Sequence, residues 1–125
     1  MSLRDPLAVA RGLGSAKGGT QHWWVQRLTA TALLLLTPWL LALLIGLIGA
    51  NQYTVRMTLA QPLTATLMLA YLLSLFWHAQ LGLQVVIGDY FHGGLEIALQ
   101  IFVKFAYALG VLAAAVALGR IVFTA

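Results

Sequence analysis

An uncharged apolar run of membrane-spanning length is the feature that most restricts how this chain can fold. The run, "LTATALLLLTPWLLALLIGLIGA", extends from Leu28 to Ala50 and contains no charged residue. A helix needs about 20 such residues to cross a hydrocarbon core of about 30 Å. The sequence therefore predicts a transmembrane helix. Pro38 should kink this helix, with Thr37 or a neighbouring helix covering the freed backbone groups.

Two further apolar runs follow the first. The second extends from Leu63 to about Ile87, after the polar connection "NQYTVRMTLAQP", and the third starts near Leu95 beyond the short loop "GDYFHGG". The sequence thus predicts a single all-α integral membrane domain with three transmembrane helices. Their predicted spans are approximately residues 28–50, 63–87 and 97–120 of a domain covering residues 1–125.

Composition excludes several other classes of protein. With 62% hydrophobic and 8% charged residues, and a mean hydropathy of +0.93, the chain lies outside the range of soluble domains. The absence of cysteine excludes disulfides, thiolate metal sites and cysteine-held iron–sulfur clusters. The net charge is +4, but the basic residues do not form a patch for nucleic acid. The first run is also too long for the apolar part of a secretory signal and should remain as an anchor.

The distribution of charge predicts the orientation in the membrane. Four basic residues and Asp5 precede the first run, whereas the first loop contains only Arg56. The positive-inside rule places the N-terminus and the loop containing Asp89 in the cytoplasm, and the C-terminus outside. Trp23 and Trp24 stand where an aromatic belt would hold the first helix at the headgroup level. The four basic residues are Arg4, Arg11, Lys17 and Arg27.

A histidine in the second run needs a partner. Helical periodicity places His78 on the same side as Ser74, Gly82 and Asp89, with Asp89 about 16 Å further along the axis. An unpaired polar group in hydrocarbon costs several kcal/mol. One interpretation is a hydrogen bond to another helix, and the other is an axial bond to haem iron. No other histidine lies inside a predicted span, so a second histidine ligand would have to come from another chain.

Other polar residues of the second helix raise similar alternatives. Gln80 and Gln84 point to the opposite side from His78 and indicate that this side also meets protein. Asp89 and Tyr90 can be ordinary residues of a membrane boundary. They can also serve a quinone head group, because tyrosine can donate a hydrogen bond to a carbonyl oxygen and a carboxylate can pass protons.

The segment "HAQLGLQVVIGDY", His78 to Tyr90, resembles the small hydrophobic membrane-anchor subunits of succinate dehydrogenase (succinate:ubiquinone oxidoreductase, respiratory Complex II). It carries the spacing from histidine to the Asp-Tyr pair of that family unbroken. The segment "GSAKGGTQHWWVQRLTATALLLLTPW", Gly14 to Trp39, is similar to the start of the first helix in bacterial members. The resemblance covers most of residues 14–94 and, by the order of spans, the third helix.

The resemblance implies a role for four residues. His78 matches the axial haem b ligand of this subunit, and the second axial ligand would come from the larger cytochrome b subunit. Tyr90 matches the tyrosine that hydrogen-bonds a ubiquinone carbonyl, and Asp89 is the acid beside it. Arg27 matches an arginine near the haem propionates, although a positive-inside anchor also explains it. Gly88 is a departure, because relatives often carry glutamate there, and its absence removes a charge near the quinone site.

The implied function is a membrane anchor that helps to bind haem b and to form the ubiquinone-reduction site, in the tricarboxylic acid cycle and the respiratory chain. The chain would have no succinate-oxidising activity of its own. FAD and the iron–sulfur clusters would belong to the flavoprotein and iron–sulfur subunits. The implied location is the bacterial inner membrane, as a multi-pass protein in contact with lipid.

Two other functions remain open at this point. The chain could be a structural or assembly subunit of another membrane complex, with His78 bridging helices. It could also be a transporter component in which His78 and Asp89 relay protons. His22 could approach the quinone pocket, but an interfacial surface residue is the simpler interpretation. Two patterns of the third run have structural readings: a solvated stripe of Glu96, Gln100 and Lys104, and small residues for close packing at Ala106, Gly110 and Ala114.

Overall fold

The computed structural model describes residues 15–124, which are almost entirely α-helical. The helices are α2 (Ser15–Gly46), α3 (Gln52–Ala60), α4 (Pro62–Tyr90) and α5 (Gly93–Thr124). Three of them contain segments long and apolar enough to cross a membrane, namely Thr20–Gly46, Pro62–Tyr90 and Gly93–Thr124. The predictions of an all-α chain and of three membrane-spanning helices are therefore confirmed, and the chain is a multi-pass membrane protein.

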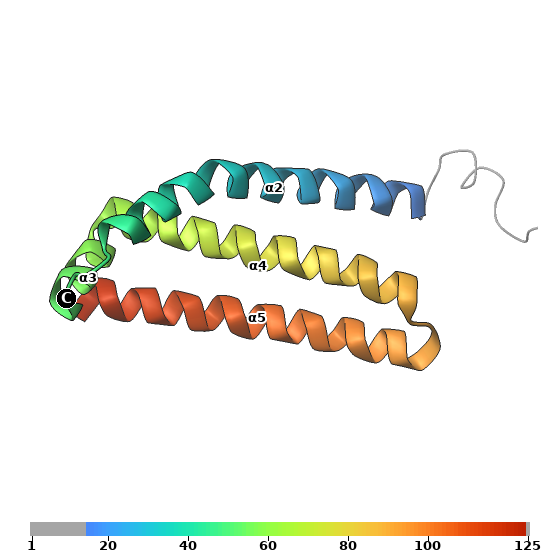
Figure 1. Ribbon diagram of the computed structural model, residues 1–125. Helices are drawn as coiled ribbons and strands as arrows, with labels where there is room; N and C mark the ends of the chain where they lie inside the picture. Colours follow the sequence, from blue (N-terminus) through green and yellow to red (C-terminus); the bar gives the residue numbers. More distant parts are fainter. Residues whose placement is uncertain (1–14, 125) are drawn as a thin grey trace, which may run out of the picture.

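The three long helices form one layer with α4 in the middle (Figure 1). Helix α4 contacts both α2 and α5, whereas within the described residues α2 and α5 do not contact each other. The hydrophobic core of this layer is very small and consists of Leu81, Ile87 and Leu118. Most apolar side chains therefore lie on the outside of the layer, where lipid or another protein can cover them.

Helix α2 differs from the predicted first span at both ends. It begins at Ser15, before the apolar run, and ends at Gly46 instead of Ala50. The chain turns after Gly46, and Gly49 adopts a φ of 80°, which glycine tolerates without steric cost. Figure 1 shows that α2 bends within its second half, as expected for a helix with Pro38 inside it.

The hydroxyl of Thr37 does not cover the carbonyl that Pro38 frees. In a regular helix the missing N–H of Pro38 would have bonded the carbonyl of Leu34. Thr37 instead donates to the carbonyl of Leu33. The prediction that Thr37 covers the freed group is wrong, because a threonine hydroxyl reaches the carbonyl four residues before itself.

The polar connection between the first two spans is itself largely helical. The side chain of Asn51 caps α3 by accepting a hydrogen bond from the Thr54 backbone N–H at 2.8 Å. Gln61 is extended, and Pro62 then starts α4 at a position where proline is favoured. Arg56 of α3 donates to the hydroxyl of Thr124 at 3.0 Å, which ties α3 to the end of α5.

The predicted loop "GDYFHGG" is shorter than expected. Helix α4 continues through Gly88 and Asp89 to Tyr90, and the N–H of Phe91 still donates to the Ile87 carbonyl at 2.9 Å. Gly93 makes the turn with a φ of 69° and already begins α5. This turn lies at the same end of the layer as the start of α2, while α3 and the end of α5 lie at the other (Figure 1). Arg4, Asp5 and Arg11, used above to predict orientation, lie outside the described residues.

Candidate functional site

His78 meets α2 through a single polar contact. Its Nδ1 lies 3.1 Å from the hydroxyl oxygen of Thr29. Thr29 is buried, with 4% of its surface exposed, and is the buried polar residue of the described part of the chain. Within residues 15–124, Nε2 of His78 has no hydrogen-bond partner. The imidazole thus uses one nitrogen to join two helices and leaves the other free.

An apolar groove of about 460 Å³ lies beside His78 on the surface of α2. It adjoins a second, more polar groove of about 520 Å³ nearer the start of α2, because Ala30 lines both. His78 is therefore at the apolar end of a continuous surface whose other end carries Arg27. The apolar groove is lined by Ala30, Leu33, Leu34, Thr37, Pro38, Leu41 and His78, and the polar groove by His22, Trp23, Gln26, Arg27 and Ala30.

The polar groove contains groups that the described residues do not satisfy. Nε2 of His22 and Oε1 of Gln26 are both buried without a hydrogen-bond partner in this part of the chain. The guanidinium of Arg27 lies over the ring of Trp23, 5.2 Å from its centroid, and Trp23 meets Trp24 edge to face at 5.1 Å. No carboxylate among residues 15–124 pairs with Arg27, so its charge is available to an acidic group.

The donor set beside the apolar groove suits a flat macrocycle with acidic edges. Among the described residues, no group of three or more His, Cys, Asp or Glu side chains could hold a bare metal ion. A haem iron carries four ligands of its own and takes only axial ligands from protein. One imidazole with a free nitrogen, an apolar wall and a cation at the polar end therefore fit a haem better than a bare metal ion.

Asp89 and Tyr90 lie at the end of α4 and are both exposed, Tyr90 to 77%. They share a helix with His78 but are separated from it by three turns, and no described contact joins them to it. The structure adds a neighbour that the sequence did not indicate. A Cβ built on Gly88 would lie 3.9 Å from the Oε1 atom of Glu96 in α5. A carboxylate from α5 therefore stands beside the position where a charge is missing from α4.

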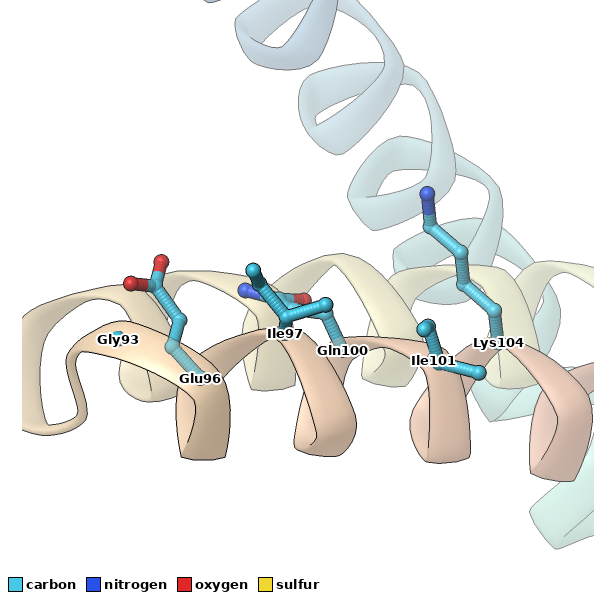
Figure 2. Close-up of a pocket in the computed structure, with 6 residues that line it drawn as sticks. All are labelled: Gly93, Glu96, Ile97, Gln100, Ile101 and Lys104. Carbon is cyan, nitrogen blue, oxygen red and sulfur yellow. The ribbon is translucent and has the colours of Figure 1, made fainter.

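Polar residues of α5 line a pocket of about 370 Å³ near the same end of the layer. Figure 2 shows Glu96 and Lys104 extending from the same side of α5, with Gln100 between them. Gln100 is not part of a solvated stripe, because its Nε2 donates to the backbone carbonyl of Gln84 in α4 at 3.1 Å. Its Oε1 is buried and has no partner among the described residues.

The side of α4 that carries Gln80 and Gln84 faces α5. Gln80 lines a narrow groove between these two helices, and Gly110 lies so close to Phe76 that an added Cβ would be 3.3 Å from Cε1 of the ring. The prediction that this side meets protein is confirmed for contacts within the chain. The small residue at position 110 permits the close approach of α5 to α4.

Comparison with known proteins identifies the family. The family model for the succinate dehydrogenase/fumarate reductase transmembrane subunit matches residues 1–119. The succinate dehydrogenase hydrophobic membrane anchor subunit of Paracoccus denitrificans is 36% identical over 96% of this chain and 93% of its own length. The corresponding subunit of Rickettsia bellii is 35% identical over 70% of each chain. The succinate dehydrogenase membrane anchor subunit of Reclinomonas americana is 37% identical over 62% of this chain and 67% of its own length.

No solved structure matches the chain. The match of the family model along nearly the whole sequence and the identity to anchor subunits confirm the resemblance inferred from the segment His78 to Tyr90. The chain therefore belongs to the family of succinate dehydrogenase and fumarate reductase transmembrane subunits, and its relatives are membrane anchors of succinate dehydrogenase.

Proposed function

We propose that this anchor subunit supplies one axial ligand to haem b and one wall of the site where ubiquinone is reduced. The observation that carries the proposal is the state of His78, whose Nδ1 contacts Thr29 while Nε2 remains free beside an apolar groove. A nitrogen placed in this way is suited to an axial bond to iron. When bound, the haem would supply one-electron redox chemistry between the partner subunits and the quinone.

The surface of α2 would hold the two chemically different parts of the haem. The apolar groove beside His78 would cover the ring, and Pro38 and the leucines there offer no competing polar group. Arg27 at the polar end would pair with a propionate, since a guanidinium binds carboxylates well. His22 and Gln26, with their unpartnered polar atoms, could share this task or bind water at the same edge.

The end of α4 would serve the quinone. Tyr90 would donate a hydrogen bond to a quinone carbonyl and so orient the head group, and Asp89 would hold a proton for transfer to it. Both side chains are exposed in the single chain, so other subunits would have to close the pocket around them. Glu96, which lies beside Gly88, would provide a second carboxylate where α4 lacks one. The loss of glutamate at position 88 is then compensated from α5.

The remaining chemistry would belong to partner subunits. Succinate oxidation at FAD and electron transfer through iron–sulfur clusters would take place in the flavoprotein and iron–sulfur subunits, and the cytochrome b subunit would provide the second axial ligand. The open faces of the three-helix layer leave room for such partners. The start of α2 and the turn between α4 and α5 would face the cytoplasm in a bacterial inner membrane, where the soluble subunits would dock.

A second function is favoured by the same contact that supports the first. The hydrogen bond between His78 and Thr29 would by itself explain a buried histidine that only bridges two helices. In that case the chain would be a structural subunit without haem. Bridging needs only Nδ1, however, and leaves Nε2 unexplained.

Absorption spectroscopy of the purified complex separates these functions. His78→Ala should abolish the b-type absorption while the four subunits still co-purify and still oxidise succinate with an artificial dye acceptor. His92→Ala is the matched control, because this histidine is exposed between α4 and α5. A full haem spectrum in the His78→Ala complex would contradict the proposal and favour the bridging role.

Tyr90→Phe tests the quinone site separately. Loss of one hydrogen bond worth about 1 kcal/mol predicts a fall of about fivefold in kcat/KM for ubiquinone, with haem content and dye-linked succinate oxidation unchanged. Tyr53→Phe is a control at the other end of the layer, where α3 exposes a tyrosine. Equal losses of quinone-linked and dye-linked activity would instead indicate a damaged complex.

A further inference from the structure

The hydroxyl of Thr29 has three polar neighbours. It lies 2.9 Å from the carbonyl of Val25, 3.0 Å from the carbonyl of Gln26 and 3.1 Å from Nδ1 of His78. A hydroxyl has one proton to donate and two lone pairs that accept. It can therefore donate to a carbonyl of its own helix and still accept a proton from the imidazole.

The two neutral tautomers of His78 differ in how well they are satisfied. If Nδ1 carries the proton, it donates to Thr29, and the hydroxyl of Thr29 donates to the carbonyl of Val25 or Gln26. If Nε2 carries the proton, this N–H points away from every acceptor in residues 15–124. An unsatisfied N–H donor next to an apolar groove costs about 1–3 kcal/mol. The arrangement thus favours the tautomer with the proton on Nδ1.

We propose that Thr29 is a positioning residue for the haem ligand: it holds His78 in the Nδ1–H tautomer and sets the plane of its ring, so that the lone pair of Nε2 faces the haem. This inference rests on the proposed function, because it assigns to Thr29 a role in ligation by His78. Buried as it is, Thr29 would not be replaced readily by water as an acceptor.

The hydrogen bond has a consequence for the bound iron. Donation from Nδ1–H to an acceptor makes the imidazole a more basic ligand, and partners of this kind typically affect metal affinity by 10- to 100-fold. A more basic ligand favours the ferric over the ferrous state. Loss of the acceptor should therefore weaken haem binding and shift the midpoint potential of the haem in the positive direction.

Two substitutions of Thr29 in the assembled complex provide the test. Thr29→Val keeps the shape of the side chain and removes the acceptor, and Thr29→Ser keeps the hydroxyl. We expect Thr29→Val to release haem to apomyoglobin about tenfold or more faster and to raise the midpoint potential in a redox titration followed by absorption. Thr29→Ser should restore both values to those of the unmodified complex.

Thr31→Val is the matched control. Thr31 is an exposed threonine of the same helix, and its hydroxyl donates to the Arg27 carbonyl at 2.8 Å without any contact to His78. This variant should leave both measurements unchanged. If Thr29→Val does not assemble, Thr29→Ala removes the same hydroxyl without inserting a second methyl group and is measured in its place.

The outcomes separate this inference from the proposed function. Wild-type haem release and potential in Thr29→Val, together with loss of haem in His78→Ala, would overturn the role of Thr29 and leave the ligand assignment intact. Retention of haem in His78→Ala would overturn both. A Thr29→Ser complex that behaves like Thr29→Val would also overturn the inference, since the hydroxyl would then not be the feature that matters.

Discussion

The two sides of α4 are built in different ways. Towards α5 the helices approach closely, with Gly110 against the ring of Phe76 and Gln100 bonded to the backbone of α4. Towards α2 there is a buried hydrogen bond, Thr29 to His78, and beside it an open apolar groove. One side is therefore closed by the chain itself, and the other combines a fixed polar contact with free space.

This difference shows how one helix can serve packing and ligand binding together. Small residues and aromatic rings pack the side that has no further task, because backbones can then come close without a hydrophobic driving force. The other side needs a rigid imidazole next to a space that the chain does not fill. The hydrogen bond of His78 to a second helix supplies that rigidity, as a supported ligand requires.

Filling the groove should break the comparison most strongly. Ala30 lines both grooves on α2, so the ring of an Ala30→Phe variant would occupy the space beside His78. We expect the haem-to-protein ratio of the purified complex to fall at least tenfold, measured from the b-type absorption, because a close-packed site does not accept both rings. Ala42→Phe, at an exposed position of the same helix, is the control. Unchanged haem content in Ala30→Phe would mean that the haem does not use this groove.

Enlarging the closed side should affect stability more than haem binding. Gly110→Leu would force a side chain into Phe76 and should cost about 1–3 kcal/mol of stability, seen as a lower temperature of thermal disassembly in detergent. Gly119→Leu is the matched control, since a Cβ at Gly119 has nothing within 4 Å in the described structure. Equal effects of the two substitutions would show that the contact between α4 and α5 does not limit stability.

Removing the polar contact on the closed side should have the smallest effect. Gln100→Ala deletes the hydrogen bond from Nε2 to the Gln84 carbonyl, and contacts of this type in membranes average about 0.6 kcal/mol. Gln84→Ala should change stability less, because only the backbone of Gln84 takes part in this bond. The same thermal disassembly measurement applies. A loss from Gln100→Ala larger than that from Gly110→Leu would reverse the order proposed here.

Much of the fold could be predicted because lipid imposes simple rules. Three long apolar runs have to become helices, since no other single-chain segment satisfies its own backbone in hydrocarbon. The boundaries were harder to predict. The helical turn from Gly88 to Tyr90 and all of α3 were expected to be loops or connections, because polar residues mark the edge of a membrane but not the end of a helix.

The candidate site divides in the same way. His78, Asp89 and Tyr90 stand out in the sequence as polar residues at helical spacing in an apolar segment. Thr29 does not stand out, because threonine is common in the first run and four threonines follow one another there at short intervals or lie nearby. Its importance appears only when His78 is placed against it. Glu96 likewise becomes relevant through its position beside Gly88.

The sequence by itself determined that this chain spans a membrane with three helices and carries one histidine deep in the second of them. Length and polarity are properties of a single segment, and lipid acts on each segment separately. Only the tertiary structure decided which nitrogen of His78 is engaged, that Thr29, 49 residues away, engages it, and that Glu96 stands beside Gly88. These contacts depend on the rotation and offset of one helix against the next, which no pattern within a single helix encodes.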